Sequence, residues 1–223
     1  MPASLFIHSP QNKDWLRAKW DALVTLHATD RAAADATWDD LIRAYSEPHR
    51  TYHNLSHIIA LLRHAEAERA RIERPEVVKF AIWFHDVIYD TRSKTNEERS
   101  AQWARGAMEK MGIDHQLITM VEQCILATQQ HQVNVANIPD LPLFLDIDLS
   151  ILGTPSAIYR HYSQGIRSEY GWVPSADYRA GRSEILRQFI DRPTLFFTPL
   201  MNARYETQAR DNLAWELKEL SST

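Results

Sequence analysis

The chain has 223 residues, of which 44% are hydrophobic, enough to bury one large core or two small ones. It carries 25 basic and 29 acidic residues, with a net charge of −4 and no basic block or acidic tail. This balance argues against a nucleic-acid polymer as partner, and the single cysteine, Cys124, excludes an intramolecular disulfide.

Helical spacing of the apolar residues, only 6 glycines and little strand-type alternation predict a mostly helical chain. Asn54 and Asp114 are expected to cap helices, Pro75 suits a first helical turn, and Gly112 is expected to close a helix. The pattern predicts helices over residues 14–28, 35–45, 55–71, 76–88, 95–111, 115–130, 175–191 and 199–220, and from 154 or 156 to 170, with an apolar segment over 143–152.

We expect one all-α domain over residues 1–223, because the chain shows no internal repeat, low-complexity segment or linker. Its core would cover roughly residues 45–215, with N-terminal helices over 11–46 packed on it. The N-terminus has no basic region followed by a long apolar stretch, and no apolar run is long enough to span a membrane. A cytoplasmic protein without a membrane partner is therefore expected. The oligomeric state stays open, because no heptad seam or unpaired strand is seen.

The most informative local feature is a hydrophobic run over residues 80–84 that ends in His85 and Asp86. Burying an imidazole and a carboxylate is costly unless a partner such as a divalent metal coordinates them. Alone the dipeptide says little, since about 0.7 occurrences are expected by chance in this composition. Its meaning depends on further ligands elsewhere in the chain.

Two histidines, His53 and His57, crowd the start of the predicted helix over 55–71. They are four residues apart, so they share a face if the helix begins early enough. For either one alone, an ordinary surface or core histidine is the plainer interpretation.

Two aspartates, Asp146 and Asp148, interrupt the apolar segment over 143–152. Aspartate is rarely buried without a partner. On a helix the two side chains would point about 200° apart, so they cannot both face one site. One is therefore expected to be a ligand and the other a cap or a surface residue.

Together His57, His85, Asp86 and one of the two aspartates offer two imidazoles and two carboxylates. Such a set suits a divalent ion such as Mn, Fe, Co, Ni or Zn and tolerates Mg. The wide spacing excludes a zinc finger and favours ligands supplied by separate helices of a bundle.

This order of ligands, His, then His-Asp, then Asp, resembles the HD-domain superfamily of metal-dependent phosphohydrolases. The resemblance covers roughly residues 45–215 and implies a compact multi-helix bundle with a metal site between helices. It implies Asp148 rather than Asp146 as the last ligand, because Asp-Ile-Asp before an apolar stretch ending in Gly153 is similar to the family's late segment. Segments similar to a group of predicted bacterial HD hydrolases are 52–57, 84–90, 96–101, 144–153, 166–170 and 178–182.

The resemblance implies hydrolysis of a phosphoester or phosphoanhydride of a nucleotide or other small phosphorylated metabolite by a metal-activated water. Asp86 would lie at the catalytic centre. A further acid or base is needed, and His53 and Asp90 are the candidates, with Glu97 and His131 as others.

Arg50, Lys94 and His131 are expected to bind the phosphate of the substrate. Arginine would do so as a bidentate donor and lysine as a point charge. The plainer interpretations are a solvated loop residue for Lys94 and a cation at a helix C-terminus for His131.

Two other functions stay open. A di-iron HD-type oxygenase would need extra histidine ligands, which His131 and His161 or His53 would have to supply. A non-catalytic regulatory module would keep the metal ligands without turnover. Tyr159 and Arg182 belong to an aromatic and basic stretch over 159–182 that is expected to pack between helices, with stacking on a base as the alternative.

Overall fold

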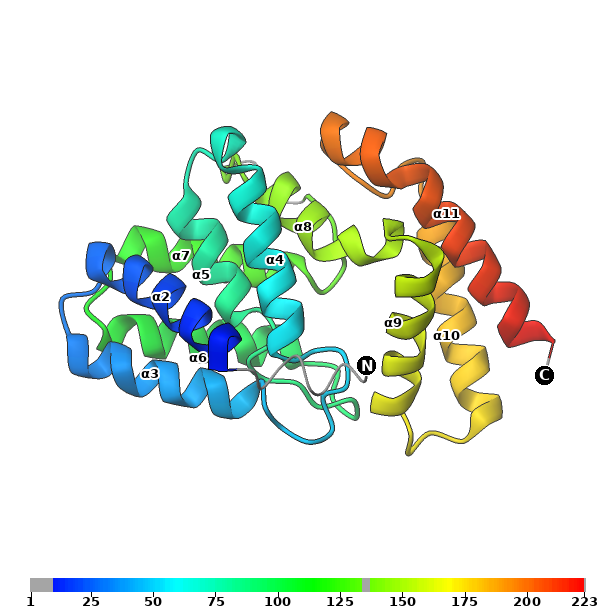
Figure 1. Cartoon of the computed structure of the whole chain (residues 1–223), viewed down its shortest axis with the longest axis horizontal. Helices are drawn as coiled ribbons and strands as arrows, with labels where there is room; N and C mark the ends of the chain where they lie inside the picture. The colour runs from blue at the N-terminus through cyan, green and yellow to red at the C-terminus, as the bar shows by residue number, and fades with distance from the viewer. Residues whose placement is uncertain (1–9, 134–136, 223) are drawn as a thin grey trace. The chain divides into compact units, whose positions relative to one another are not determined.

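The computed structural model describes residues 10–133 and 137–222, and within these ranges all regular structure is helical. The prediction of an all-α chain is therefore confirmed. The helices, labelled as in Figure 1, are α2 (Pro10–His27), α3 (Arg31–Ala44), α4 (Leu55–Ala67), η1 (Arg69–Arg71), α5 (Pro75–Phe84), α6 (Asn96–Lys110), α7 (His115–Ala127), α8 (Leu141–Leu149), η2 (Ser150–Gly153), α9 (Ser156–Glu169), α10 (Ser175–Ile190) and α11 (Pro199–Ser221).

The chain forms two compact units, Met1–Leu141 and Pro142–Thr223. The boundary falls at the start of α8, so the first unit holds α2 to α7 and the second holds the rest of α8 and α9 to α11. That residues 1–223 make a single domain stays a prediction.

Helix α5 forms the middle of the first unit, where it packs against α4, α6 and α7 (Figure 1). Seven of its ten residues are buried, as a helix that is apolar all round requires. Trp20 of α2 meets Phe80, Trp83 and Phe84 edge-on, with ring centroids 5.6 to 6.2 Å apart. The run of apolar residues before His85 is thus the centre of the core, and it carries the histidine to a buried position.

Local signals placed several helix ends correctly. The Asn54 side chain accepts a hydrogen bond from Ser56 N and caps α4, and Asp114 caps α7 through the amides of Gln116 and Leu117. Gly112 follows α6 with φ of 68°, and a Cβ there would lie 2.0 Å from Thr29 Oγ1. Only glycine therefore fits at this turn.

Two helices end earlier than predicted. Helix α4 stops at Ala67, and the helix expected to reach residue 88 stops at Phe84. His85 is the C-terminal cap of α5, and Val87 N donates to Phe84 O to form a turn. As a result His85 and Asp86 lie just beyond the end of the helix rather than within its last turns.

The second unit is built around contacts among η2, α9, α10 and α11. Inside it, the Tyr159 hydroxyl donates to Glu216 Oε2 at 2.5 Å, and Arg182 Nε donates to Glu216 Oε1 at 2.8 Å. Tyr159 and Glu216 are buried, so the charge of Glu216 is paired with a cation and a phenol donor. These contacts assign Tyr159 and Arg182 to packing between helices.

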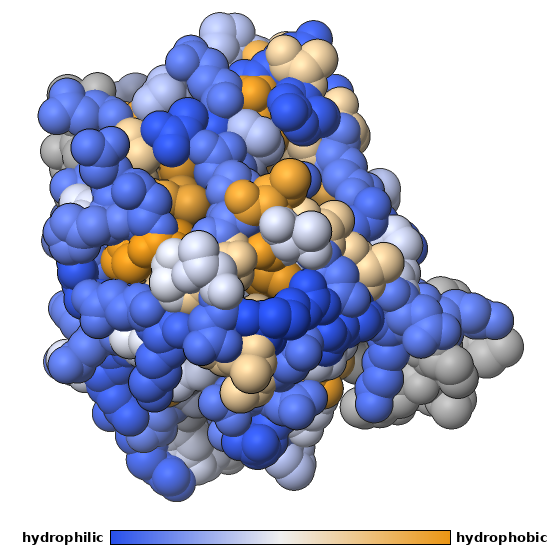
Figure 2. All heavy atoms as spheres, turned by 90° about the vertical axis from the view of Figure 1, so that its left-hand side faces the viewer, coloured by the Kyte–Doolittle hydropathy of each residue, from blue (hydrophilic) through white to orange (hydrophobic). Residues whose placement is uncertain are grey.

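Figure 2 shows one face of the molecule, on which hydrophilic residues prevail and hydrophobic ones form small groups. No single helix among the described residues is both long and apolar enough to cross a membrane. One bent pair, Leu141–Gly153 with Ser156–Glu169 at 101°, meets that test by length and composition alone.

Candidate metal centre

Three of the four predicted ligands converge within the first unit. His57 Nε2 and His85 Nε2 lie 3.2 Å apart, and Asp86 Oδ2 lies 3.1 Å from His85 Nε2 and 3.9 Å from His57 Nε2. The two histidines are only 5% and 2% exposed. His57 comes from α4 and the other two from the turn after α5. We call His57, His85 and Asp86 the triad.

The triad fits a divalent metal. Two nitrogens that each bind one ion at about 2.1 Å lie about 3.0 to 3.4 Å apart for bond angles between about 90° and 110°. The 3.2 Å between the two Nε2 atoms falls in that range. Two imidazoles with a carboxylate suit the mid-row divalent ions, and three protein ligands leave coordination positions open.

The backbone carbonyl of Ile82 orients the His85 ring for metal binding. His85 Nδ1 lies 3.0 Å from Ile82 O, and because a carbonyl can only accept, Nδ1 carries the proton of the neutral ring. Nε2 then presents a lone pair toward the Asp86 carboxylate, which is also an acceptor. Two acceptors 3.1 Å apart need a cation between them, either a proton on His85 or a metal ion. Support of a ligating histidine from its other nitrogen is typical of metal sites.

Asp86 is the anionic member of the triad. Burial alone would raise the pKa of Asp86, but the charge and hydrogen bond of His85 in its protonated form outweigh it, together with smaller effects of His53 and His57. The pKa of Asp86 is therefore held well below its usual range. Its carboxylate is ionised and able to bind a cation at neutral pH.

His53 lies at the edge of the triad. Its ring centroid is 5.9 Å from that of His57 and 4.3 Å from that of Tyr89. It is half-buried and close enough to Asp86 to lower the pKa of that carboxyl group. The expected role of His53 in proton transfer stays a prediction.

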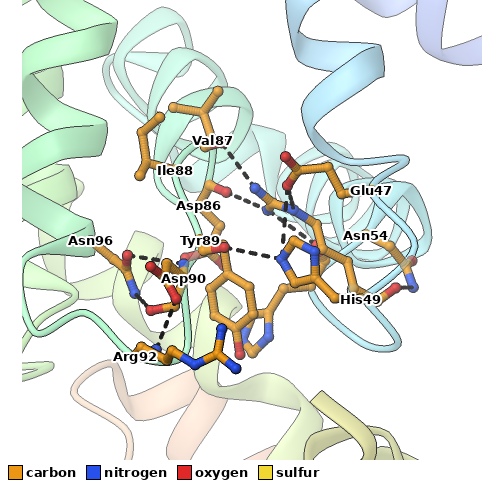
Figure 3. Close-up of polar contacts among 12 residues, drawn as sticks. Glu47, His49, Asn54, Asp86, Val87, Ile88, Tyr89, Asp90, Arg92 and Asn96 are labelled. Carbon is orange, nitrogen blue, oxygen red and sulfur yellow. Dashed lines mark hydrogen bonds and ion pairs between the residues drawn. The ribbon is translucent and has the colours of Figure 1, made fainter. Parts of the chain in front are cut away.

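Asp90 and Lys94 lie in the loop before α6, and both are exposed. The Asp90 carboxylate accepts from Arg92 N at 2.9 Å, and the Asp90 backbone exchanges two hydrogen bonds with the Asn96 side chain (Figure 3). These contacts close the loop. The catalytic role of Asp90 and the phosphate-binding role of Lys94 stay predictions.

Arg50 was expected to bind phosphate, but in the structure its guanidinium is directed inward. It donates to the backbone carbonyls of Asp86 and Val87 and pairs with Glu47 (Figure 3). No contact of this kind was predicted from the sequence.

Glu97, at the start of α6, is half-buried. Its pKa is raised first by burial and then by the charges of Asp86 and Glu98, against the opposing effects of its own backbone amide and of His131. Glu97 therefore lies within electrostatic reach of Asp86, and His131 lies within electrostatic reach of Glu97. His131 has a left-handed backbone with φ of 45°.

We expect Glu97→Gln to raise the melting temperature of the metal-free protein at pH 7.5. Because the pKa is raised in the folded state, the ionised carboxylate costs stability, and this cost vanishes once pH falls below the unfolded pKa. The gain should be about 1–3 °C at pH 7.5 and absent near pH 4. Added Mn²⁺ should abolish it, because a nearby cation favours the carboxylate.

Thermal unfolding followed by circular dichroism at the two pH values, with and without Mn²⁺, measures this effect. Glu73→Gln is the matched control, since it removes one charge from an exposed position of the same unit that does not contribute to the raised pKa of Glu97. A melting temperature for Glu97→Gln at or below that of the unmodified protein at pH 7.5 without metal contradicts the prediction.

The two aspartates of α8, in the second unit, differ in their surroundings. Asp146 is 0% exposed, and its carboxylate accepts from Phe197 N at 2.7 Å, Thr198 N at 2.8 Å and Thr198 Oγ1 at 2.6 Å. Thr198 is the N-terminal cap of α11, so Asp146 anchors the start of that helix. Asp148 is half-buried, and its assignment as the fourth metal ligand stays a prediction.

One support of the triad, the Ile82 carbonyl, was not predicted. The signal for it was present in the sequence, because the last carbonyls of a helix lack intrahelical donors and a histidine three residues later can reach back to one. To predict this contact from the sequence, one would have to know that α5 ends at Phe84.

Comparisons with known proteins found no matching protein family, no matching curated protein and no matching solved structure. What is shown for this chain is an all-helical protein with a buried His, His and Asp group that can hold a metal ion. The resemblance to HD-domain hydrolases therefore rests on the residues quoted for it.

Proposed function

We propose that the protein is a metal-dependent phosphohydrolase of the HD type. Its substrate would be a nucleotide or another small phosphorylated metabolite, and the bond cleaved a phosphoester or phosphoanhydride. The observation that carries the proposal is the convergence of His57 Nε2, His85 Nε2 and Asp86 Oδ2, with Nδ1 of His85 held by a carbonyl. The order of these residues in the chain, followed by Asp148, supports the HD type.

The proposed roles follow from the chemistry of the side chains. His57, His85 and Asp86 would hold the ion, with Asp148 as a fourth ligand. A divalent ion bound there would lower the pKa of a water molecule and neutralise charge on a phosphoryl oxygen. His53, beside the triad, would exchange a proton with the attacking water or the leaving oxygen.

Metal content and phosphate release test this function together. We expect protein purified without added metal to contain about one divalent ion per chain. Phosphate release from a panel of nucleotides and sugar phosphates should require Mn²⁺, Mg²⁺, Co²⁺, Ni²⁺, Fe²⁺ or Zn²⁺. A chelator should reduce the rate to background, and one of these ions should restore it.

The same experiment separates the alternatives. Two irons per chain with oxygen consumption would favour the oxygenase. Bound metal with no phosphate release from any substrate, with all these ions supplied, would favour a non-catalytic regulatory module. Either result would overturn the proposed hydrolase.

A further inference from the structure

The guanidinium of Arg50 is buried beside the metal centre, with its side chain only 1% exposed. Nη1 donates to Asp86 O at 2.6 Å and to His53 O at 3.3 Å, and Nη2 donates to Val87 O at 3.0 Å. Nε donates to Glu47 Oε2 at 2.9 Å. Figure 3 shows Asp86, Val87 and Glu47, which accept three of these hydrogen bonds.

The carbonyls that Arg50 contacts lie where a helix has just ended. Carbonyls at and beyond the last turn of a helix have no intrahelical N–H donor, and α5 ends at Phe84. Burying a polar group without a partner is costly, and so is burying a cation. The planar guanidinium serves several carbonyls at once, which a lysine ammonium cannot do with the same geometry.

Arg50 is also tied to the start of the other helix that carries a ligand. Asn54 Nδ2 donates to Arg50 O at 3.3 Å and to Thr51 O at 2.8 Å, while Asn54 Oδ1 caps α4 through Ser56 N. His57 lies in the first turn of that helix. One residue therefore joins the backbone that bears Asp86 to the backbone that leads into His57.

Two tyrosines hold the guanidinium in place. Its Cζ lies 5.2 Å from the ring centroid of Tyr45 and 5.4 Å from that of Tyr89. Such contacts attract a cation to the ring face. The Tyr45 hydroxyl in turn donates to Trp83 O at 3.0 Å, which links this packing to the last turn of α5.

From these contacts we propose that Arg50 is a positioning residue of the metal centre, which sets the separation of the His57 and Asp86 ligand atoms by joining their two backbone segments. This rests on the proposed metal-dependent function. Its donors are engaged with the protein's own carbonyls and with Glu47, so it acts through the ligands and not by contacting phosphate.

The variant Arg50→Lys tests the proposal, because it keeps the charge and loses the planar donor array. We expect Mn²⁺ affinity, measured by calorimetry at fixed pH, to fall about 10- to 100-fold, the usual cost of losing an outer-shell support. Arg43→Lys is the matched control, since Arg43 lies on α3 with its side chain 74% exposed. It should change the affinity less than about twofold.

Inorganic phosphate, titrated into the Mn²⁺-loaded protein, distinguishes positioning from substrate binding. If Arg50→Lys binds Mn²⁺ as tightly as the unmodified protein, the proposal is overturned. If the Mn²⁺-loaded variant then also binds phosphate more weakly, Arg50 is a phosphate ligand instead. If Arg50→Lys does not fold, Glu47→Gln is the second test of the proposal. This variant keeps the guanidinium of Arg50 but weakens its contact with residue 47. We expect about two- to fivefold weaker Mn²⁺ binding, and unchanged binding would overturn the proposal.

Metal affinity does not require turnover. If no substrate is hydrolysed and Arg50→Lys still weakens Mn²⁺ binding, the hydrolase proposal fails and the positioning role stands. If hydrolysis is found and Arg50→Lys leaves Mn²⁺ affinity unchanged, the hydrolase proposal stands and the positioning role of Arg50 fails.

Discussion

We expect the replacement of His85 with alanine to abolish metal binding and, with it, the proposed metal-dependent phosphate release. His85 is the central member of the triad, since its Nε2 lies 3.2 Å from His57 Nε2 and 3.1 Å from Asp86 Oδ2. Without the imidazole, two ligand atoms remain and their cation-binding geometry is lost. We expect metal affinity to fall at least about 100-fold, more than for the loss of an outer-shell group. Because the ring is buried, a stability loss of about 1–3 kcal/mol accompanies the change.

Elemental analysis of the purified variant and calorimetric titration with Mn²⁺ measure the loss, and far-UV circular dichroism shows that the variant is folded. His115→Ala is the matched control, because His115 is an exposed histidine of the same unit at the start of α7. It should bind metal as the unmodified protein does. A folded His85→Ala protein that keeps its full metal content would show that the site is assigned to the wrong residues.

Replacing Asp146 with alanine destabilises the protein by about 2–4 kcal/mol and leaves its metal content unchanged. The substitution leaves Phe197 N, Thr198 N and Thr198 Oγ1 without their acceptor, and a buried donor without a partner costs about 1–3 kcal/mol. We expect the total cost to stay below the sum for three unpaired donors, because water can enter part of the space left by the carboxylate. The pKa of Asp146 is raised by burial, and the hydrogen bonds from Thr198 and Phe197 offset this effect only in part.

Asp148→Ala is the natural counterpart, two residues away on the same helix. We expect a stability change below about 1 kcal/mol, together with Mn²⁺ affinity about tenfold weaker or more, if Asp148 is the fourth ligand. Urea denaturation followed by circular dichroism and calorimetry with Mn²⁺ give both quantities for both variants. The opposite pattern, with metal lost in Asp146→Ala and stability lost in Asp148→Ala, would exchange the two roles.

The helices and several of their ends were predicted well because their signals are local. Asn54 and Asp114 cap helices through amides two or three residues away, and Gly112 takes a backbone angle that other residues avoid. The boundary at residue 88 was predicted wrongly because Val87 and Ile88 continue the apolar pattern beyond Phe84, where the helix ends. The contact of Arg50 with Asp86 O, 36 residues later in the chain, cannot be read from any local pattern.

The helical class, the caps at Asn54 and Asp114 and the three residues that converge could be predicted from the sequence alone, because spacing, capping and the order of residue types can all be read along the chain. The different roles of neighbouring residues of similar type, in contrast, depend on how the helices pack. This packing brought His57 and His85 together across 28 positions, turned Arg50 inward and used Asp146 to anchor α11. The physical reason is that the role of a polar side chain depends on which donors, acceptors and charges surround it, and packing brings these from distant parts of the chain.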